Sequence, residues 1–190
     1  SGVPCTLAGI FEAQAKFGKL KPKQVLQPVI DLARNGYVVT KNQGESLRMH
    51  RQLFIQVNGP NTFFGKEIKA GDTLRQPALA NTLERIAKHG KNEFYKGETA
   101  KILVNHFQKN GGIISKEDLL QYKAVWRDPI VFPYRDLKII SMAPPSSGGI
   151  TLGQILKMLE PYPLRNLGHH SPEYVQLLVE AERRAYADRN

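Results

Sequence analysis

Cysteine is nearly absent from this sequence, and long apolar runs, internal repeats and low-complexity segments are absent altogether. Cys5 is the only cysteine, which excludes a disulfide framework and a zinc site made of several thiolates. No apolar run approaches the roughly 20 residues that a membrane-spanning helix needs, so we predict no membrane span. Residues 1–9 have neither the basic start nor the apolar core of a signal peptide, although a leader removed earlier would leave no trace.

The composition that remains is ordinary for a soluble protein. The 190 residues suit one domain or a large portion of one. Hydrophobic residues make up 41% and charged residues 23%, as in typical soluble domains. Intrinsic disorder is therefore not expected.

The formal net charge is +10, with a pI near 9.7. A basic excess can mark an anionic partner such as nucleic acid or an acidic membrane. Lysines and arginines are nevertheless spread from Lys16 to Arg189, and the four lysines between Lys16 and Lys23 are interrupted by apolar residues. We predict a solvated basic surface with no nucleic-acid partner. The alternative is an independent basic binding module for nucleic acid or an acidic surface.

Helical periodicity dominates the first 124 residues. One helix follows Pro22 and ends before Gly36, with the apolar set Val25, Leu26, Val29, Ile30 and Ala33. A second begins near Asp72 or Thr73, or at Pro77, and stops at Gly90; its apolar residues are Leu74, Leu79, Leu83, Ile86 and Ala87. A third ends at Gly111-Gly112, with Ala100, Leu103, Val104 and Phe107 on one face. Ser115 and Asp118 then form a capping pair for a short helix through Tyr122.

The pattern changes after residue 124. The runs 129–134 and 137–142 are rich in β-branched and aromatic residues and are joined at Arg135-Asp136, which predicts a β-hairpin. Pro133 makes its strand an edge strand or a bend. A helix with Ile150, Leu152, Ile155, Leu156 and Leu159 follows a short loop. The last helix opens at Ser171-Pro172, with the apolar face Val175, Leu178, Val179 and Ala185.

The predicted fold class is therefore α+β, predominantly α-helical with a late β-hairpin. Strands and helices do not alternate, so a doubly wound parallel sheet is disfavoured. We expect residues 1–190 to form a single helix-rich fragment: a helical segment over residues 1–124, the hairpin 125–142, a loop 143–149 and helices over 150–190.

The loop between hairpin and helix is the most informative stretch for function. It contains Pro144, Pro145, Ser146, Ser147, Gly148 and Gly149. Prolines stiffen such a loop, and glycines permit close backbone approach or positive φ, so we expect at least one of its glycines at positive φ. The loop is either a ligand-binding loop whose amides face an anion or a structural connector. It has neither a phosphate-loop lysine nor the spacing of a nucleophile elbow.

Other candidate residues are weaker. His169 and His170 are adjacent and diverge on a helix or strand, and no Cys or carboxylate lies at zinc spacing. We therefore predict no metal site and no cofactor. Cys5 would be a nucleophile only beside a base, and no residue nearby in the sequence is an evident one.

A series of short motifs resembles, in order, the large subunit of the γ-glutamyltranspeptidase family. Ser1-Gly2-Val3-Pro4 with Thr6 and Ala8-Gly9 is similar to its S-G-x-P-G-T-x-A-G motif, with Cys5 in place of a glycine. Further matches are Phe17-Gly18 and residues 25–28, 32–36, 71–74, 76, 93–97, 110–112, 117–119, 122–125, 134–135, 144–149, 181–182 and 185–189. Each motif is weak alone, but the ordered set spans the chain.

The resemblance implies a fragment of a four-layer αββα N-terminal-nucleophile hydrolase. In that family the precursor cleaves itself, and the new N-terminal threonine of the small subunit attacks γ-glutamyl amides such as glutathione. The resemblance thus implies the small subunit as a partner, γ-glutamyl compounds as substrates and a periplasmic or secreted location.

No catalytic or substrate-binding residue falls on this chain by the same resemblance. The family's carboxylate-binding arginine lies before Ser1, and its carboxylate-binding serine pair belongs to the small subunit. Ser146-Ser147 is a different pair. The expected contribution is scaffold plus one loop near the active cleft, Pro144 to Gly149, in a chain that is inactive alone.

Overall fold

The structure, a computed structural model, describes residues 2–189, so Ser1 of the first motif lies outside the described residues. It forms two compact units, the first ending at Ala124 and the second beginning at Val125. The boundary falls where helical periodicity gives way to the β-branched run. That 1–190 is one fragment of a larger subunit stays a prediction.

The first unit is almost entirely helical. Its elements are α1 Thr6–Phe17, α2 Pro22–Asn35, β1 Tyr37–Val38, α3 Lys41–Asn58, the 3-10 turn η1 Phe63–Gly65, β2 Thr73–Leu74, α4 Pro77–His89, α5 Lys91–Lys96, α6 Glu98–Lys109 and α7 Lys116–Gln121. The helices predicted after Pro22, before Gly90 and before Gly111 are confirmed as α2, α4 and α6. The capping pair is also confirmed: Asp118 N donates to Ser115 Oγ (3.1 Å) and Ser115 N to Asp118 Oδ2 (2.8 Å).

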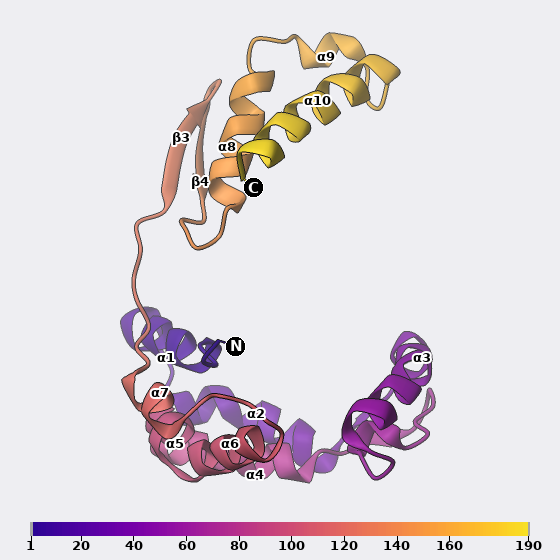
Figure 1. Cartoon of the computed structure of the whole chain (residues 1–190), viewed down its shortest axis with the longest axis vertical. Coiled ribbons are helices and arrows are strands. Elements are labelled where there is room, and N and C mark those ends of the chain that lie inside the picture. Colours follow the sequence, from indigo (N-terminus) through magenta and orange to yellow (C-terminus); the bar gives the residue numbers. More distant parts are fainter. Residues whose placement is uncertain (1, 190) are drawn as a thin grey trace. The chain divides into compact units, whose positions relative to one another are not determined.

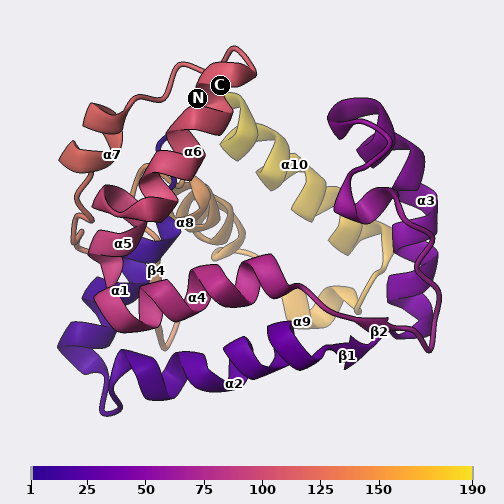
Figure 2. The same ribbon diagram turned by 90° about the horizontal axis from the view of Figure 1, so that it is seen from below.

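Helices α2 and α4 lie side by side, as Figure 2 shows. Each turns its apolar stripe toward the other: Ile30 and Ala33 of α2 are buried, as are Ala80 and Ile86 of α4. Polar contacts close the exposed edge of this pair, where the Arg34 guanidinium meets Asn81 Oδ1 (2.9 Å) and Glu84 (2.7 Å).

The segment before α4 corrects one prediction. A helix beginning at residue 72 or 73 is wrong, because Thr73 and Leu74 form β2, which pairs antiparallel with β1. Leu74 lies opposite Tyr37 and is buried. The helix begins instead at Pro77, whose fixed φ and missing N–H suit the first helical position.

The core of the first unit gathers around α5, α6 and α7. Its buried residues are Ala8, Tyr95, Ala100, Val104, Ile114 and Leu119. The Tyr95 hydroxyl connects this core to the start of the chain, since it donates to Pro4 O (2.8 Å) and accepts from Ala8 N (3.2 Å). Pro4 and Ala8 of the first motif are therefore held against α5.

The second unit is a hairpin packed on helices. It contains β3 Ile130–Tyr134, β4 Leu137–Ser141, α8 Gly148–Leu159, α9 Leu164–Leu167 and α10 Pro172–Arg189. The predicted hairpin is confirmed, with Pro133 opposite Lys138 in its register. Figure 1 shows α8 between the hairpin and α10. Glu160, just after α8, fastens the hairpin turn by accepting from Arg135 N (2.7 Å).

One further expectation for this unit is wrong, and another is confirmed only in part. Neither Gly148 nor Gly149 has positive φ, because α8 begins at Gly148 and takes both into its first turn. Of the predicted apolar face of α10, Ala185 is buried and Leu178 is half-buried, whereas Val175 and Val179 are 43% and 50% exposed. Ala181, which the apolar periodicity does not include, is buried beside them.

The hairpin has one covered face and one open face. Phe132 and Ile139 pair on the half-buried side, whereas the paired residues Val131 and Ile140 on the other side are 49% and 64% exposed. An open apolar face of this kind normally receives another element. Among residues 2–189, no helix is both long and apolar enough to cross a membrane.

Candidate functional site

The loop 143–149 connects β4 to α8 through a tight backbone path. Ser147 precedes the helix, and its carbonyl accepts from Thr151 N (2.9 Å). The Ser146 hydroxyl accepts from Gly148 N (3.2 Å). The chain therefore satisfies one of the first helical amides with its own side chain, which favours the structural connector over an anion-binding loop.

Close approach, rather than positive φ, explains one of the glycines. A Cβ at Gly149 would overlap the carbonyl oxygen of Met142 and would lie 3.3 Å from Ile130 Cβ. A Cβ at Gly148 would meet only Ser146 Oγ, at 3.3 Å. Gly149 thus lets the start of α8 lie directly against the end of β4 and so positions the loop.

An open groove of about 760 Å³ runs along this loop within the second unit. It is lined by Val125, Arg127, Pro129, Ile140, Ser141, Met142, Ala143, Pro144, Pro145 and Ser146. The groove joins the loop to the open face of the hairpin. Of the predicted site residues, Pro144, Pro145 and Ser146 line it. That the loop lies near an active cleft stays a prediction.

The geometry at Ser146 and Ser147 does not resemble that of an activated nucleophile. Such a hydroxyl needs a base within hydrogen-bond reach. The hydrogen bonds of the described residues give the Ser146 hydroxyl only the Gly148 amide, and Ser147 contributes its backbone carbonyl. The arrangement can hold a loop in place.

Cys5 is exposed and precedes α1. Its φ of −105° is ordinary for a non-glycine residue, so a cysteine in place of the motif's glycine causes no backbone strain at this position. Tyr122 lies beside this thiol, and burial, followed by the electrostatic effect of Cys5, raises the pKa of Tyr122. Only the phenolate could accept the thiol proton, and a raised pKa keeps the phenol protonated at neutral pH.

His169 and His170 stack on each other, with ring centroids 3.8 Å apart. Within residues 2–189 no group of three or more potential metal ligands comes together. The pair therefore has no neighbouring ligand among the described residues that could complete a metal site.

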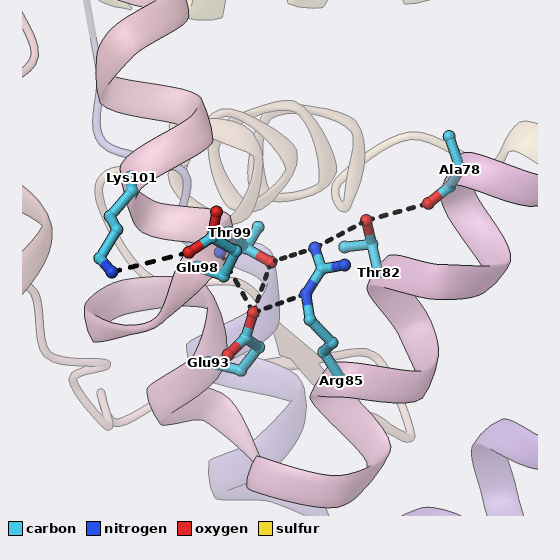
Figure 3. Close-up of polar contacts among 7 residues, drawn as sticks. All are labelled: Ala78, Thr82, Arg85, Glu93, Glu98, Thr99 and Lys101. Atoms are coloured by element: carbon cyan, nitrogen blue, oxygen red, sulfur yellow. Dashed lines mark hydrogen bonds and ion pairs between the residues drawn. The ribbon is translucent and has the colours of Figure 1, made fainter.

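The most buried polar cluster joins α4, α5 and α6 (Figure 3). Glu93 is 7% exposed, and its Oε1 accepts from Arg85 Nε (2.9 Å), Thr99 N (3.1 Å) and Thr99 Oγ1 (3.0 Å). Arg85 also donates to Thr82 Oγ1 (3.3 Å) and Thr99 Oγ1 (3.2 Å). The carboxylate satisfies an amide in the first turn of α6, where a negative charge is favoured.

Burial alone raises the pKa of Glu93, but the hydrogen bonds from Arg85 and Thr99 outweigh it and hold the pKa below its ordinary value. The ionised carboxylate therefore stabilises the folded unit. Sequence reasoning does not find this cluster, because Glu93 stands out in the sequence only as a member of a family motif. Its Oε1 accepts three hydrogen bonds from neighbouring helices, which favours a structural role.

Replacing Glu93 by glutamine should destabilise the first unit by about 2 kcal/mol at pH 7, the usual range for hydrogen bonds to a charged group. Because the folded pKa is depressed, the wild-type advantage is complete above the ordinary value of 4.5 and is lost as the pH falls through the folded pKa. Urea unfolding of both proteins from pH 7 to pH 3 measures this difference in stability. The pKa of Asp118 is also lowered, but Asp118 is present in both proteins, so its contribution cancels in the difference. A difference that stays constant below pH 4.5 would contradict the prediction.

Comparison with known proteins identifies relatives along the whole chain. The family model described as gamma-glutamyltranspeptidase matches residues 1–190. The glutathione hydrolase proenzyme of Escherichia coli is 43% identical, and the match covers 100% of this chain and 33% of that protein. An acylase ACY 1 proenzyme of a Pseudomonas species is 38% identical over 98% of this chain and 34% of its own length.

The fold is shared as well. The crystal structure of Helicobacter pylori gamma-glutamyltranspeptidase superposes with a TM-score of 0.94 at 41% identity, covering 100% of this chain and 55% of that one. The chain spans about a third of the length of the curated relatives it matches. Mostly helical structure with small sheets is thus common to this chain and a solved relative.

Proposed function

The chain belongs to the gamma-glutamyltranspeptidase family, and we propose that it is a portion of the large subunit of an enzyme that cleaves γ-glutamyl amides, glutathione included. The family match over residues 1–190, with a closely superposing solved relative, carries the proposal. The chain supplies scaffold and one loop, and the reacting groups lie elsewhere in the protein.

In the proposed reaction the small subunit's N-terminal threonine acts as nucleophile. Its hydroxyl attacks the γ-amide carbonyl while its own amine accepts the proton. Backbone amides stabilise the oxyanion. The leaving amine takes that proton as the C–N bond breaks, and the γ-glutamyl group is then transferred from the threonine ester to water or to an acceptor amine, which restores the threonine hydroxyl. This chain contributes none of these groups.

The open face of the hairpin supports the proposed place in a larger fold. Val131 and Ile140 form a cross-strand pair whose exposure suits a sheet that packs on further elements. We propose that the hairpin belongs to the sheet sandwich of a four-layer αββα core completed by the rest of the protein. The groove beside Pro144, Pro145 and Ser146 would then face neighbouring segments.

The relatives point to two substrate classes. A glutathione hydrolase proenzyme and an acylase proenzyme both match nearly all of this chain, at 43% and 38% identity. The higher identity favours γ-glutamyl amides. Periplasmic or secreted location and partnership with the small subunit follow from the same assignment.

The full-length protein should cleave itself into two pieces. Peptides of this chain should all come from the larger piece, and the smaller piece should begin with threonine. Intact-mass spectrometry and N-terminal sequencing of the purified protein measure this, with a threonine-to-alanine variant as the uncleaved control. Cleavage inside residues 1–190, or an uncleaved protein with full activity, would refute the proposed function.

A further inference from the structure

Helix α3 forms a small groove with the segment that returns toward β2. The groove has a volume of about 280 Å³ and is lined by Lys41, Gly44, Glu45, Leu47, Arg48, Arg51, Lys66, Glu67, Ile68, Lys69 and Ala70. A Cβ at Gly44 would lie 2.7 Å from Ala70 N, so the missing side chain lets the returning segment lie directly on α3. Figure 2 shows that segment beside α3.

The groove combines an apolar lining with cations. Leu47 and Ile68 are half-buried in it. Five cations and two carboxylates line it, an excess of three positive charges. Glu67 is already paired with Lys69 (3.2 Å).

Some of the cationic side chains that line the groove have donors that are not paired with another group of the protein. Arg51 uses Nε to donate to Gly65 O (2.8 Å), which leaves its terminal nitrogens. Within residues 2–189, neither the Lys41 nor the Arg48 side chain makes a hydrogen bond or ion pair. Glu45, on the same helix, offsets one charge without pairing with either.

We propose that this groove binds a small anion that carries an apolar group, such as a carboxylate on a short hydrocarbon chain. The hydrocarbon contacts Leu47 and Ile68, and the carboxylate accepts hydrogen bonds from Arg48 and Lys41. A guanidinium presents paired donors that match a carboxylate. The groove volume of about 280 Å³ lies just below the range of ordinary ligand pockets, which suits a small ligand. Every lining residue belongs to the first unit, and the site is independent of the proposed threonine chemistry.

The test is a titration of the 190-residue chain with hexanoate, followed by two-dimensional amide NMR at low salt. Hexanol lacks the charge, and acetate lacks the hydrocarbon. Hexanoate should give saturable shifts confined to amides of residues 41–51 and 66–70, and both partial probes should bind at least about tenfold more weakly.

The double variant Lys41→Gln/Arg48→Gln should weaken hexanoate binding at least about tenfold. The double variant Lys19→Gln/Lys109→Gln makes the same change in net charge outside the groove and should bind as the wild type does. The NMR spectrum of each unliganded variant verifies its fold. Shifts spread over the chain, equal binding of hexanol or acetate, or equal losses in both double variants would overturn the proposal.

Discussion

The isolated 190-residue chain should release no product from a γ-glutamyl anilide, even at high protein concentration. Amide cleavage needs a nucleophile, a base positioned on it and donors for the oxyanion. The best nucleophiles that the sequence offers fail on geometry: the Cys5 thiol is exposed beside Tyr122, and the Ser146 hydroxyl accepts a backbone amide. The full-length protein, assayed in parallel, should hydrolyse the substrate at a rate many orders of magnitude above that of the isolated chain.

Cys5→Ser is the control for this assay. If the purified chain showed turnover that disappears in the Cys5→Ser protein, the cysteine would be a nucleophile and the chain an enzyme in its own right. Equal background in both proteins is the expected result.

Gly149→Ala should be the most damaging single methyl group in the second unit. Alanine ordinarily favours a helix over glycine by up to about 1 kcal/mol. Here the added Cβ would overlap the carbonyl oxygen of Met142, which belongs to the backbone and cannot rotate away. The steric term wins, and we expect a net loss of about 2–3 kcal/mol.

Gly148→Ala is the matched control, because its Cβ would meet only the end of the Ser146 side chain. It should be neutral or slightly stabilising. Thermal unfolding by circular dichroism should show the midpoint of Gly149→Ala about 10 °C below that of Gly148→Ala. The Gly149→Ala substitution in the full-length protein should lower the yield of cleaved enzyme. Equal midpoints for the two variants would show that the contact between α8 and β4 does not restrict this position.

Local signals account for what the sequence predicts well. The Ser115 and Asp118 side chains cap helix α7, which begins at the residue after Ser115, so the capping pair predicts the helix from local sequence alone. The hairpin is equally local, since Arg135 and Asp136 lie between two β-rich runs, and Arg135 adopts a φ of 53° in the turn. These elements are determined within a few residues.

Contacts between distant segments account for what the sequence does not predict. Leu74 continues an apolar pattern that looks helical, yet it pairs with Tyr37 in a sheet, and nothing near either residue indicates the partner. The three bonds to Glu93 come from two other helices. The loop sequence predicts that its glycines serve either positive φ or close backbone approach, and only the contact with the distant end of β4 shows that close approach is what requires Gly149.

The family motifs predict which family the chain belongs to, but they identify no catalytic residue on it. Pro144 to Gly149 is one of the matched motifs, and its place beside an open groove is consistent with a structural loop in a larger fold. Gly149 allows α8 to lie close to the end of β4, and the Ser146 hydroxyl accepts a backbone amide within the loop. We propose that the catalytic groups of the enzyme belong to other segments of the protein.

Covalent labelling tests the central claim most directly. The full-length protein is treated with a reactive glutamine analogue, digested and mapped by mass spectrometry. We predict that the label is confined to the N-terminal threonine of the smaller piece, with every peptide of this chain, including that of Cys5, unmodified. A label on Cys5, Ser146 or Ser147 that blocks activity would contradict the assignment of this chain as non-catalytic scaffold.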